Sequence, residues 1–372
     1  MNKNIQFAKH QQEFYTVLSQ RVNQYFKTNN ISRYANAEMI IKTTFMMLLF
    51  LVPYVIALSG AVTSYWGYLG LCFVMGLGVA GIGLSIMHDA NHGAYSSKPW
   101  VNHFMSYTLN FVGGNSFNWK IQHNVLHHTY TNIYDVDEDI SPRGTLRMSP
   151  DSPWHPLHRF QHIYAWFLYG LMTFVWIVAK DFFRLVRYQK DGLVKKQKAN
   201  PVVEWIILLI TKVVYFSYII LLPALLLPFT IWQILLGFFV MHYVSGFILA
   251  VVFQPAHVLE GTAYFMPDSD GNLENTWAVH QLHTTTNYAH RNKLLSWYVG
   301  GLNFQVEHHL FPNICHVHYR NLSSIVRATA EEFGHPYKMK ETFRSAIAAH
   351  ARLLYQLGQS KTVPVPSAYA VA

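Results

Sequence analysis

The run that decides the fold begins at Phe229 and ends at Phe253, and it reads FTIWQILLGFFVMHYVSGFILAVVF. It contains no Asp, Glu, Lys or Arg. A helix crosses the hydrocarbon core of a bilayer with about 20 apolar residues, so this run is long enough to span one. We therefore expect a transmembrane helix here. The polar side chain of His242 within it should face the interior of the helix bundle, in a packing contact or a hydrogen bond.

Three other runs meet the same length requirement, at residues 37–59, 62–87 and 203–227. The first two of the four runs lie only a few residues apart, and so do the last two, so each pair should form a helical hairpin. The two turns contain no Lys or Arg, whereas residues 1–36 and 180–198 carry many. Because Lys and Arg concentrate on the cytoplasmic side of membrane proteins, both hairpins should enter and leave there, with both termini cytoplasmic.

The composition also indicates a membrane protein. Of 372 residues, 51% are hydrophobic, 16% are aromatic and only 13% are charged, which is little charge for a soluble globular protein. The net charge of +9 fits cytoplasmic basic segments, and no motif that reads a nucleic-acid groove accompanies it, so nucleic-acid binding is disfavoured. Cys72 and Cys315 are too few for a disulfide framework or a cysteine-based metal site.

These observations predict an all-α integral membrane protein, with four transmembrane helices in two hairpins and a cytosolic helical cap that carries a histidine-rich di-metal site. The expected parts are a cytosolic N-terminal segment at 1–36, a membrane domain at 37–320, a cytosolic helical segment at 321–359 and a flexible tail at 360–372. The run at 163–179 is just long enough to span. A crossing there would separate the histidine clusters, so we expect an interfacial or buried helix.

Three histidine-rich clusters lie beyond the ends of apolar runs: His88-Asp-Ala-Asn-His92, His123-Asn-Val-Leu-His127-His128 and Gln305-Val-Glu-His308-His309. Histidines four apart share one face of a helix, and imidazole is the commonest metal ligand in proteins. Neutral nitrogen ligands suit iron, copper or zinc better than calcium or magnesium. Histidine tolerated at membrane exits would explain one cluster, but three clusters with two His-His doublets predict a site able to hold two metal ions.

Several residues outside the cluster histidines are weaker candidates. His257 follows the fourth apolar run on the expected cytoplasmic side, so it is either a further ligand or an ordinary interfacial histidine. His280 and His283 are less favoured as ligands. Acidic residues near the clusters, Asp89 and the run 135–139, either hydrogen-bond ligand imidazoles or belong to a solvated or capping loop.

In these motifs the chain resembles the integral-membrane fatty acid desaturases, whose boxes follow the patterns H-x(3–4)-H, H-x(2–3)-HH and [HQ]-x(2–3)-HH. The resemblance covers roughly residues 40–320, and two hairpins with cytosolic boxes fit the arrangement of that family. Gln305, which opens the third box, is similar to the front-end subgroup. Three runs are similar to that subgroup as well: His127-His-Thr-Tyr-Thr-Asn132, Gln254-Pro-Ala-His257 and Gln281-Leu-His-Thr-Thr-Thr-Asn287.

The resemblance implies an oxidoreductase that uses O₂ and two iron ions to insert a cis double bond between an existing one and the carboxyl end of a fatty acyl-CoA or acyl-lipid, as delta-6 and delta-5 members do. Gln305 would bind one iron or orient a bound water. Asp89, Asp137, Asp139 and Asn287 are candidates for hydrogen bonds to the ligands. The implied metal ligands are His88, His92, His123, His127, His128, His257, His308 and His309, with Gln305 as a weaker donor.

Many front-end desaturases carry a fused cytochrome b5 domain with a His-Pro-Gly-Gly motif, which is absent from this sequence. Electrons are therefore expected from a separate ferredoxin, or from cytochrome b5 and its reductase. Alternatives are a sphingoid-base desaturase or a fatty acid hydroxylase of the same architecture, and a lipid-binding scaffold that has kept the boxes. A divalent-metal transporter is less favoured, since transport needs ligands near the middle of the bilayer.

Overall fold

The computed structural model describes residues 5–9, 12–141 and 144–359, so the tail predicted for residues 360–372 lies outside the described part. The fold is helical, as predicted, and two short parallel strands, β1 (Asn287–Tyr288) and β2 (Met339–Lys340), make up its sheet in the described residues. The chain divides into two compact units. We call residues 36–121 and 166–251 the span unit, and residues 1–35, 122–165 and 252–372 the histidine unit.

Within the described residues, five helices are long and apolar enough to cross a membrane: Ala37–Leu58, Tyr65–Asn91, Pro156–Lys190, Pro201–Leu226 and Ile231–His257. Four of them coincide with the runs expected from the sequence. The remaining helix, Pro156–Lys190, contains the run at 163–179. By length and composition it qualifies like the others, and the sequence set it aside only because a crossing there would separate the histidine clusters. Its interfacial or buried position stays a prediction.

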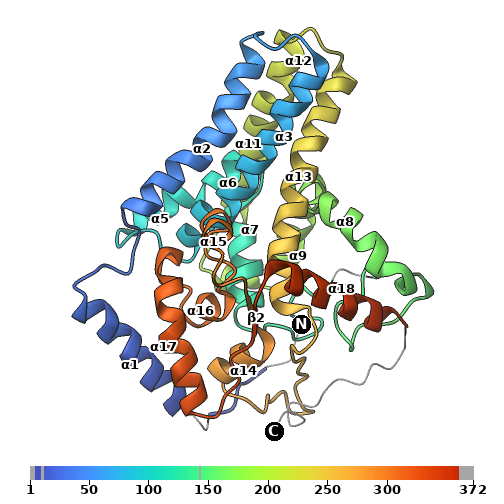
Figure 1. Ribbon diagram of the computed structural model, residues 1–372. Helices are drawn as coiled ribbons and strands as arrows, with labels where there is room; N and C mark the ends of the chain where they lie inside the picture. Colours follow the sequence, from blue (N-terminus) through green and yellow to red (C-terminus); the bar gives the residue numbers. More distant parts are fainter. Residues whose placement is uncertain (1–4, 10–11, 142–143, 360–372) are drawn as a thin grey trace. The chain divides into compact units, whose positions relative to one another are not determined.

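The long helices of the span unit are drawn in Figure 1, where α2, α3, α11 and α13 run alongside one another. Local signals set where these helices begin. The side chain of Asn36 accepts a hydrogen bond from the backbone N–H of Met39, and Asn200 caps the next hairpin in the same way, directly before Pro201. The bounds are α2 (Ala37–Leu58), α3 (Tyr65–Gly81), α4 (His88–Asn91), α11 (Pro201–Phe216), α12 (Leu222–Leu226) and α13 (Ile231–His257).

Glycines allow close packing inside the span unit. A Cβ on Gly78 of α3 would lie 2.7 Å from the backbone nitrogen of Phe50 in α2. A Cβ on Gly246 of α13 would lie 2.6 Å from the carbonyl oxygen of Gly170 in α8 (Gln161–Val175). Small residues at such crossings let helix backbones approach closely, as is common in membrane bundles. The part of α8 that belongs to this unit is therefore packed tightly against α13.

The segment after the second candidate span, which includes the apolar residues 104–117, is broken into short helices. Gly113 ends one of these helices with a left-handed φ of 96°, and a Cβ there would collide with the ring of Tyr215. The bounds are α5 (Pro99–Ser106), α6 (Thr108–Phe111) and α7 (Ser116–Lys120), followed by a π-helical turn at Ile121–His127; beyond α8 lie α9 (Asp181–Lys190) and α10 (Leu193–Lys196).

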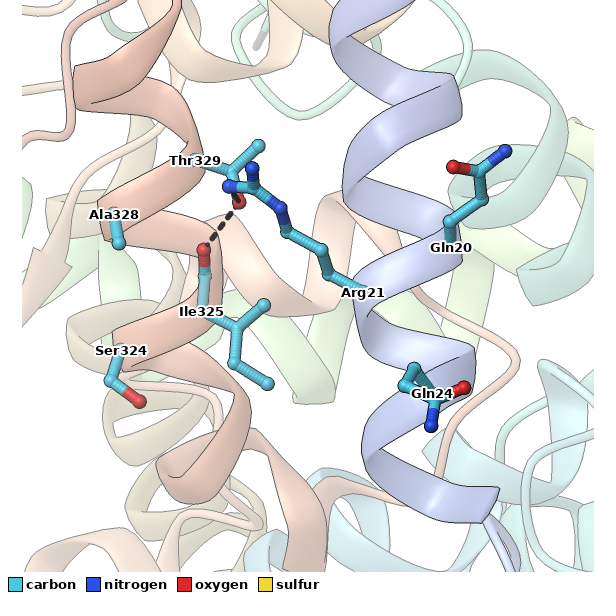
Figure 2. Close-up of a pocket in the computed structure, with 7 residues that line it drawn as sticks. All are labelled: Gln20, Arg21, Gln24, Ser324, Ile325, Ala328 and Thr329. Atoms are coloured by element: carbon cyan, nitrogen blue, oxygen red, sulfur yellow. Dashed lines mark hydrogen bonds between the residues drawn. The ribbon is translucent and has the colours of Figure 1, made fainter. Parts of the chain in front are cut away.

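The histidine unit is built around a separate core. Apolar side chains of α1, α14, α16 and α17 form one buried cluster, with Phe14, Leu18 and Val22 from α1 packed against Leu322 and Val326 of α17. Figure 1 shows α1 beside α17, and Figure 2 shows the groove between them, where the guanidinium of Arg21 reaches Thr329. The bounds are α1 (Glu13–Thr28), α14 (Trp277–Thr284), α15 (Lys293–Tyr298), α16 (Gln305–Leu310), α17 (Tyr319–Glu332) and α18 (Phe343–Gln359).

This core fixes the position of the third histidine cluster. Val306 and Leu310 of α16 belong to it, so the helix that carries His308 and His309 is anchored by its own apolar residues. The helical character predicted for residues 321–359 is confirmed by α17 and α18, which are separated by a break at Gly334. The predicted cytosolic location of this segment, like the domain boundaries at 37 and 320, stays a prediction.

Candidate metal centre

Three imidazoles from two distant segments point their Nε2 atoms at one another in the histidine unit. The Nε2 of His128 lies 3.1 Å from the Nε2 of His123 and 2.9 Å from the Nε2 of His308. Two imidazole nitrogens that bind one metal at about 2.0–2.1 Å, at angles near 90–110°, lie about 2.9–3.4 Å apart. The spacing of these three nitrogens therefore fits a shared metal ion.

A second group brings His127, His257 and His309 together, with ligand nitrogens within 4.8 Å of one another. Their ring centroids are 4.6–5.0 Å apart. The nitrogens of His128, His308 and His309 meet the same 4.8 Å limit, so His309 belongs to two groups. Two adjacent ligand sets that share a histidine can accommodate two ions, which is what the sequence clusters predicted.

The ring of His127 is oriented by a carboxylate. Its Nδ1 lies 3.1 and 3.0 Å from the two oxygens of Asp137 and 3.5 Å from an oxygen of Asp139. The backbone N–H groups of Asn132 and Asp139 donate to Asp137 at 2.9 and 3.0 Å and fix it in place. A carboxylate on Nδ1 fixes the tautomer and the orientation of a histidine ring. Asp137 therefore contacts a box histidine, and its role beside a metal ligand stays a prediction.

Three further histidines show the same arrangement with different partners. The Nδ1 of His309 lies 2.8 Å from Oε1 of Gln281, and the Nδ1 of His257 lies 3.3 Å from the carbonyl oxygen of Thr284. The Nδ1 of His308 lies 3.3 Å from the hydroxyl of Tyr319. In each case the outer ring nitrogen is engaged, which leaves Nε2 to face the group. The sequence did not identify Gln281, Thr284 or Tyr319 in this role.

The carboxylates also set the electrostatics. Burial by itself would lower the pKa of His127, but the charges of Asp137 and Asp139 and the Asp137 hydrogen bond outweigh it and raise that pKa to about 9. Burial would likewise raise the pKa of Asp137, but the charge and hydrogen bond of His127 bring it below its usual value. The site therefore attracts positive charge, and a metal ion that binds His127 must displace a proton from it.

The first cluster lies in the span unit, at the end of the helix Tyr65–Asn91. The rings of His88 and His92 are 4.9 Å apart at their centroids, as expected for positions i and i+4 of a helix. Both rings contact the indole of Trp119, at 5.5 and 5.8 Å. Asp89 is buried, with a carboxylate oxygen 3.7 Å from the Nδ1 of His88. This pair is therefore held in a defined orientation within its own unit.

Other candidates from the sequence fall into different places. Asn287 bonds Glu307 at 2.8 Å and accepts from the backbone N–H of Val306, so its bonds are to the backbone and carboxylate of α16 rather than to a histidine. His280 bonds the carbonyl oxygen of Thr131, away from both groups. The structure places His283 in neither metal group of the described residues. In the span unit His242 contacts the hydroxyl of Tyr215, which confirms the predicted hydrogen bond.

The residues present fit a transition metal. Gln305 is fully buried near His257, yet in the described part of the chain neither polar atom of Gln305, nor the Nε2 of His257, has a hydrogen-bond partner of normal geometry. Buried polar atoms without partners are costly, and a bound ion would satisfy them. A donor set dominated by imidazole, with few carboxylates, suits iron, zinc or copper and not calcium.

Comparisons with known proteins agree with this site. Residues 63–341 match the family described as fatty acid desaturase. The chain is 38% identical to an sn-1 linoleoyl-lipid 6-desaturase of Synechocystis sp., over 93% of this chain and 96% of the relative. It is 35% identical to the enzyme of the same name from Arthrospira platensis, over 90% and 89%. An acyl-lipid (8-3)-desaturase of Physcomitrium patens is 35% identical, over 93% and 72%.

This chain belongs to the fatty acid desaturase family. It is therefore an oxidoreductase of lipid metabolism, as the three boxes predicted, and its five apolar helices indicate an integral membrane protein. The histidine groups described above are compatible with a di-iron site.

Proposed function

We propose that the protein is a front-end acyl-lipid desaturase, which inserts a cis double bond between an existing double bond and the carboxyl end of a lipid-linked fatty acid. Delta-6 is the position we favour, and delta-5 is the nearest alternative. The observation that carries this proposal is the identity to two 6-desaturases along nearly their whole length. The six converging imidazoles of the histidine unit support it, since alkyl C–H bonds have no acidity that a side-chain base can use.

We assign the metal ligands to the three boxes together with His257 and Gln305. The geometry of the histidine unit supports seven of these residues. His88 and His92 are assigned from the family motif. When bound, two irons would supply the oxidant, derived from O₂ and two electrons, that removes hydrogen from two adjacent methylene groups. The full set is His88, His92, His123, His127, His128, His257, Gln305, His308 and His309.

The residues of this chain contribute orientation and protection. Asp137, Gln281 and Tyr319 contact the Nδ1 atoms of His127, His309 and His308, so that these rings would present Nε2 to bound ions in a fixed orientation. His128, His308 and His309 are almost fully buried, which keeps bulk water away from a strong oxidant. Gln305 is a neutral donor, and in this proposal it binds one ion directly or orients a water on it.

The proposed topology has four crossings in two hairpins, with the histidine boxes and both termini on the cytoplasmic side. Basic residues in 1–36 and 180–198 support this orientation. The helix Pro156–Lys190 would then lie in the interface or within the protein without crossing. Electrons would come from a separate ferredoxin or cytochrome b5, and the substrate would arrive from the surrounding lipid.

The experiment is to express the chain in a host that lacks polyunsaturated lipids and to feed it linoleic acid. The expected product is a fatty acid lighter by two hydrogens, with the new double bond at carbon 6 when located by mass spectrometry, and found in membrane lipids before the CoA pool. A product heavier by one oxygen would show that the protein is a hydroxylase and not a desaturase. A change confined to long-chain bases would favour the sphingoid-base reading, and no lipid change with iron bound would overturn the proposal.

A further inference from the structure

Helix α15 exposes a large apolar side chain directly after two basic ones. Leu294 is 78% exposed, and its neighbours Arg291 and Lys293 are exposed as well. Burial of a leucine side chain is favourable, so a leucine that stands in water forgoes that stabilisation. A single exposed leucine needs no explanation by itself. Here, however, the depth of α15 and the charge around it suggest a reason why Leu294 is exposed.

The depth of α15 is fixed by contacts with the end of a membrane-spanning helix. Within the histidine unit, the hydroxyl of Tyr288 donates to the carbonyl oxygen of Val252 at 2.9 Å, and the N–H of Thr286 donates to Ala256 at 2.8 Å. Leu295 of α15 packs into the same buried cluster as Ala256 and Tyr288. Residues 252–257 are the last turns of α13, so α15 lies at their level.

The length of α13 places that level in the headgroup layer. Ile231–His257 has 27 residues, whereas a helix with 1.5 Å of rise per residue crosses the hydrocarbon core of about 30 Å with about 20. If the crossing starts at Ile231, the core ends close to residue 250. Val252 and Ala256 then lie among the lipid headgroups, and α15 lies there with them.

The surroundings of α15 carry unbalanced positive charge. Around α15, residues 288–326 contain Arg291, Lys293 and Arg320 and a single acidic residue, Glu307, whereas Arg327 of α17 is paired with Glu331. Glu307 is fully buried and already accepts from Asn287 and Tyr337, so it does not neutralise the surface. The adjacent segment 340–344 contributes Lys340, Glu341 and Arg344, which add a further net positive charge.

Arg320 extends this basic surface beneath α15. Its guanidinium donates to the carbonyl oxygen of His290 at 2.7 Å and to the hydroxyl of Ser296 at 3.1 Å, and it lies 5.5 Å from the ring centre of Phe304. These bonds hold the group in place, while the described part of the chain offers it no carboxylate partner. A fixed guanidinium is suited to phosphate because its donors match two phosphate oxygens.

We propose that α15, together with Arg320, is a site for anionic phospholipid at the membrane surface. Leu294 enters the outer part of the acyl-chain region, and Arg291, Lys293 and Arg320 face the phosphate. Tyr319, which bonds His308, directly precedes Arg320 in the chain, so the site is linked to the third histidine box through adjacent residues. The inference goes beyond the proposed function, which does not specify the headgroup that the protein contacts.

The test attaches an environment-sensitive fluorophore to the Leu294→Cys variant of the full chain, reconstituted in phospholipid vesicles. Cys72 and Cys315 are buried, so the unsubstituted chain serves as the labelling blank. Ser324→Cys, on exposed α17, is the matched control. Lipids brominated in their acyl chains should quench the label at 294 several-fold more than the label at 324. Equal, weak quenching at both positions would overturn the insertion of Leu294.

The headgroup is tested with the double variant Arg291→Gln/Lys293→Gln on the Leu294→Cys background. In the parent, vesicles that contain phosphatidylglycerol should give stronger quenching than vesicles of phosphatidylcholine alone, and added salt should reduce the difference. The double variant should lose this preference, whereas Arg327→Gln, an exposed arginine of α17, should keep it. A parent with no preference for the anionic lipid would overturn the headgroup assignment even if Leu294 is quenched.

An acidic soluble electron carrier is the other partner that a basic surface could attract. If such a protein shields the label at 294 from a water-soluble quencher, and brominated lipid does not quench it, the surface belongs to a protein partner and the lipid site is wrong. None of these readouts uses desaturation. Quenching without any fatty acid product would therefore retain the lipid site and reject the proposed function, and the reverse result would do the opposite.

Discussion

The two units bury polar groups in opposite ways. In the span unit, Lys212 and Asp181 form a closed pair: the ammonium donates to Asp181 at 2.7 Å and to the carbonyl oxygens of Gly113 and Ile177 at 2.6 and 2.8 Å. The other oxygen of Asp181 accepts from the indole of Trp176 at 2.8 Å. Every donor of the lysine is used, so this charge is compensated within the protein and belongs to its architecture.

In the histidine unit, by contrast, ring nitrogens of several buried imidazoles converge on one another. The outer nitrogens of His127, His308 and His309 contact Asp137, Tyr319 and Gln281, and the three rings belong to the ligand groups described above. Imidazole nitrogens gathered in this way are typical ligands of a metal ion. The comparison teaches that burial of charged and polar groups does not identify a site by itself. What identifies it is the convergence of several nitrogen ligands within reach of one ion.

The comparison predicts its largest effect at the inner nitrogens. His127→Ala and His308→Ala should each abolish product and lower the iron bound per purified chain, while the protein stays in the membrane at normal yield. His103→Ala removes an exposed histidine of α5 and serves as the control. Fatty acid analysis and metal analysis of the same preparations measure both. Full activity in either site variant would remove these residues from the metal centre.

Substitutions in the Lys212–Asp181 pair should lower the stability of the protein and leave its iron content unchanged. Lys212→Ala leaves the carboxylate of Asp181 buried without its ammonium, which costs about 3–5 kcal/mol when a buried pair is broken from one side. Thermal unfolding in detergent should show the loss, with iron per folded chain unchanged. The double variant Lys212→Met/Asp181→Asn should recover most of the stability. If Lys212→Ala unfolds like the parent, the pair is not the structural element described here.

A smaller effect is expected at Asp137, which hydrogen-bonds the proposed metal ligand His127. Asp137→Asn keeps the shape of the side chain but removes the charge that orients His127, so iron affinity should fall about 10–100-fold. Competition with a chelator measures it, and excess iron should restore activity. Asp139→Asn is the matched control, because Asp139 lies farther from His127, at 3.5 Å, and is partly exposed. Equal losses in both variants would contradict the distinct role of Asp137.

The smallest effect concerns pH and a histidine outside the site. His350 of α18 is buried and donates to the carbonyl oxygen of Val258, and burial lowers its pKa to about 4. Because the unfolded chain binds this proton near pH 6.5, the contribution of His350 is complete above that pH and is lost as pH falls toward 4. Between pH 7.5 and pH 5.5 the loss should be about 1 kcal/mol.

The His350→Asn variant checks this dependence, because asparagine keeps a donor near the position of Nδ1 but does not titrate. We expect it to be less stable than the parent at pH 7.5 and to lose less stability on acidification, as measured by thermal unfolding at the two pH values. Parallel pH profiles for parent and variant would show that His350 does not contribute to acid sensitivity.

Much of the fold was visible in the sequence, because membrane spans and helix faces are local properties. Four of the five candidate spans follow from apolar runs of sufficient length, and the fifth, around 163–179, was set aside because a crossing there would separate the histidine clusters. The spacing of His123 and His127 indicated a shared helix face, and the structure has a π-helical turn at Ile121–His127.

By itself, then, the sequence determined that the protein is a helical membrane protein, which side chains are candidates for the metal, and which family of enzymes it resembles. Only the tertiary structure decided which groups hold those imidazoles. His309 meets Gln281 and His128 meets His308 across 28 and 180 positions of the chain, and Thr284 takes part through a backbone carbonyl that any residue would offer. Residue spacing reports on neighbours within one helix. Contacts between distant segments depend on how separate cores pack, and no local pattern encodes that packing.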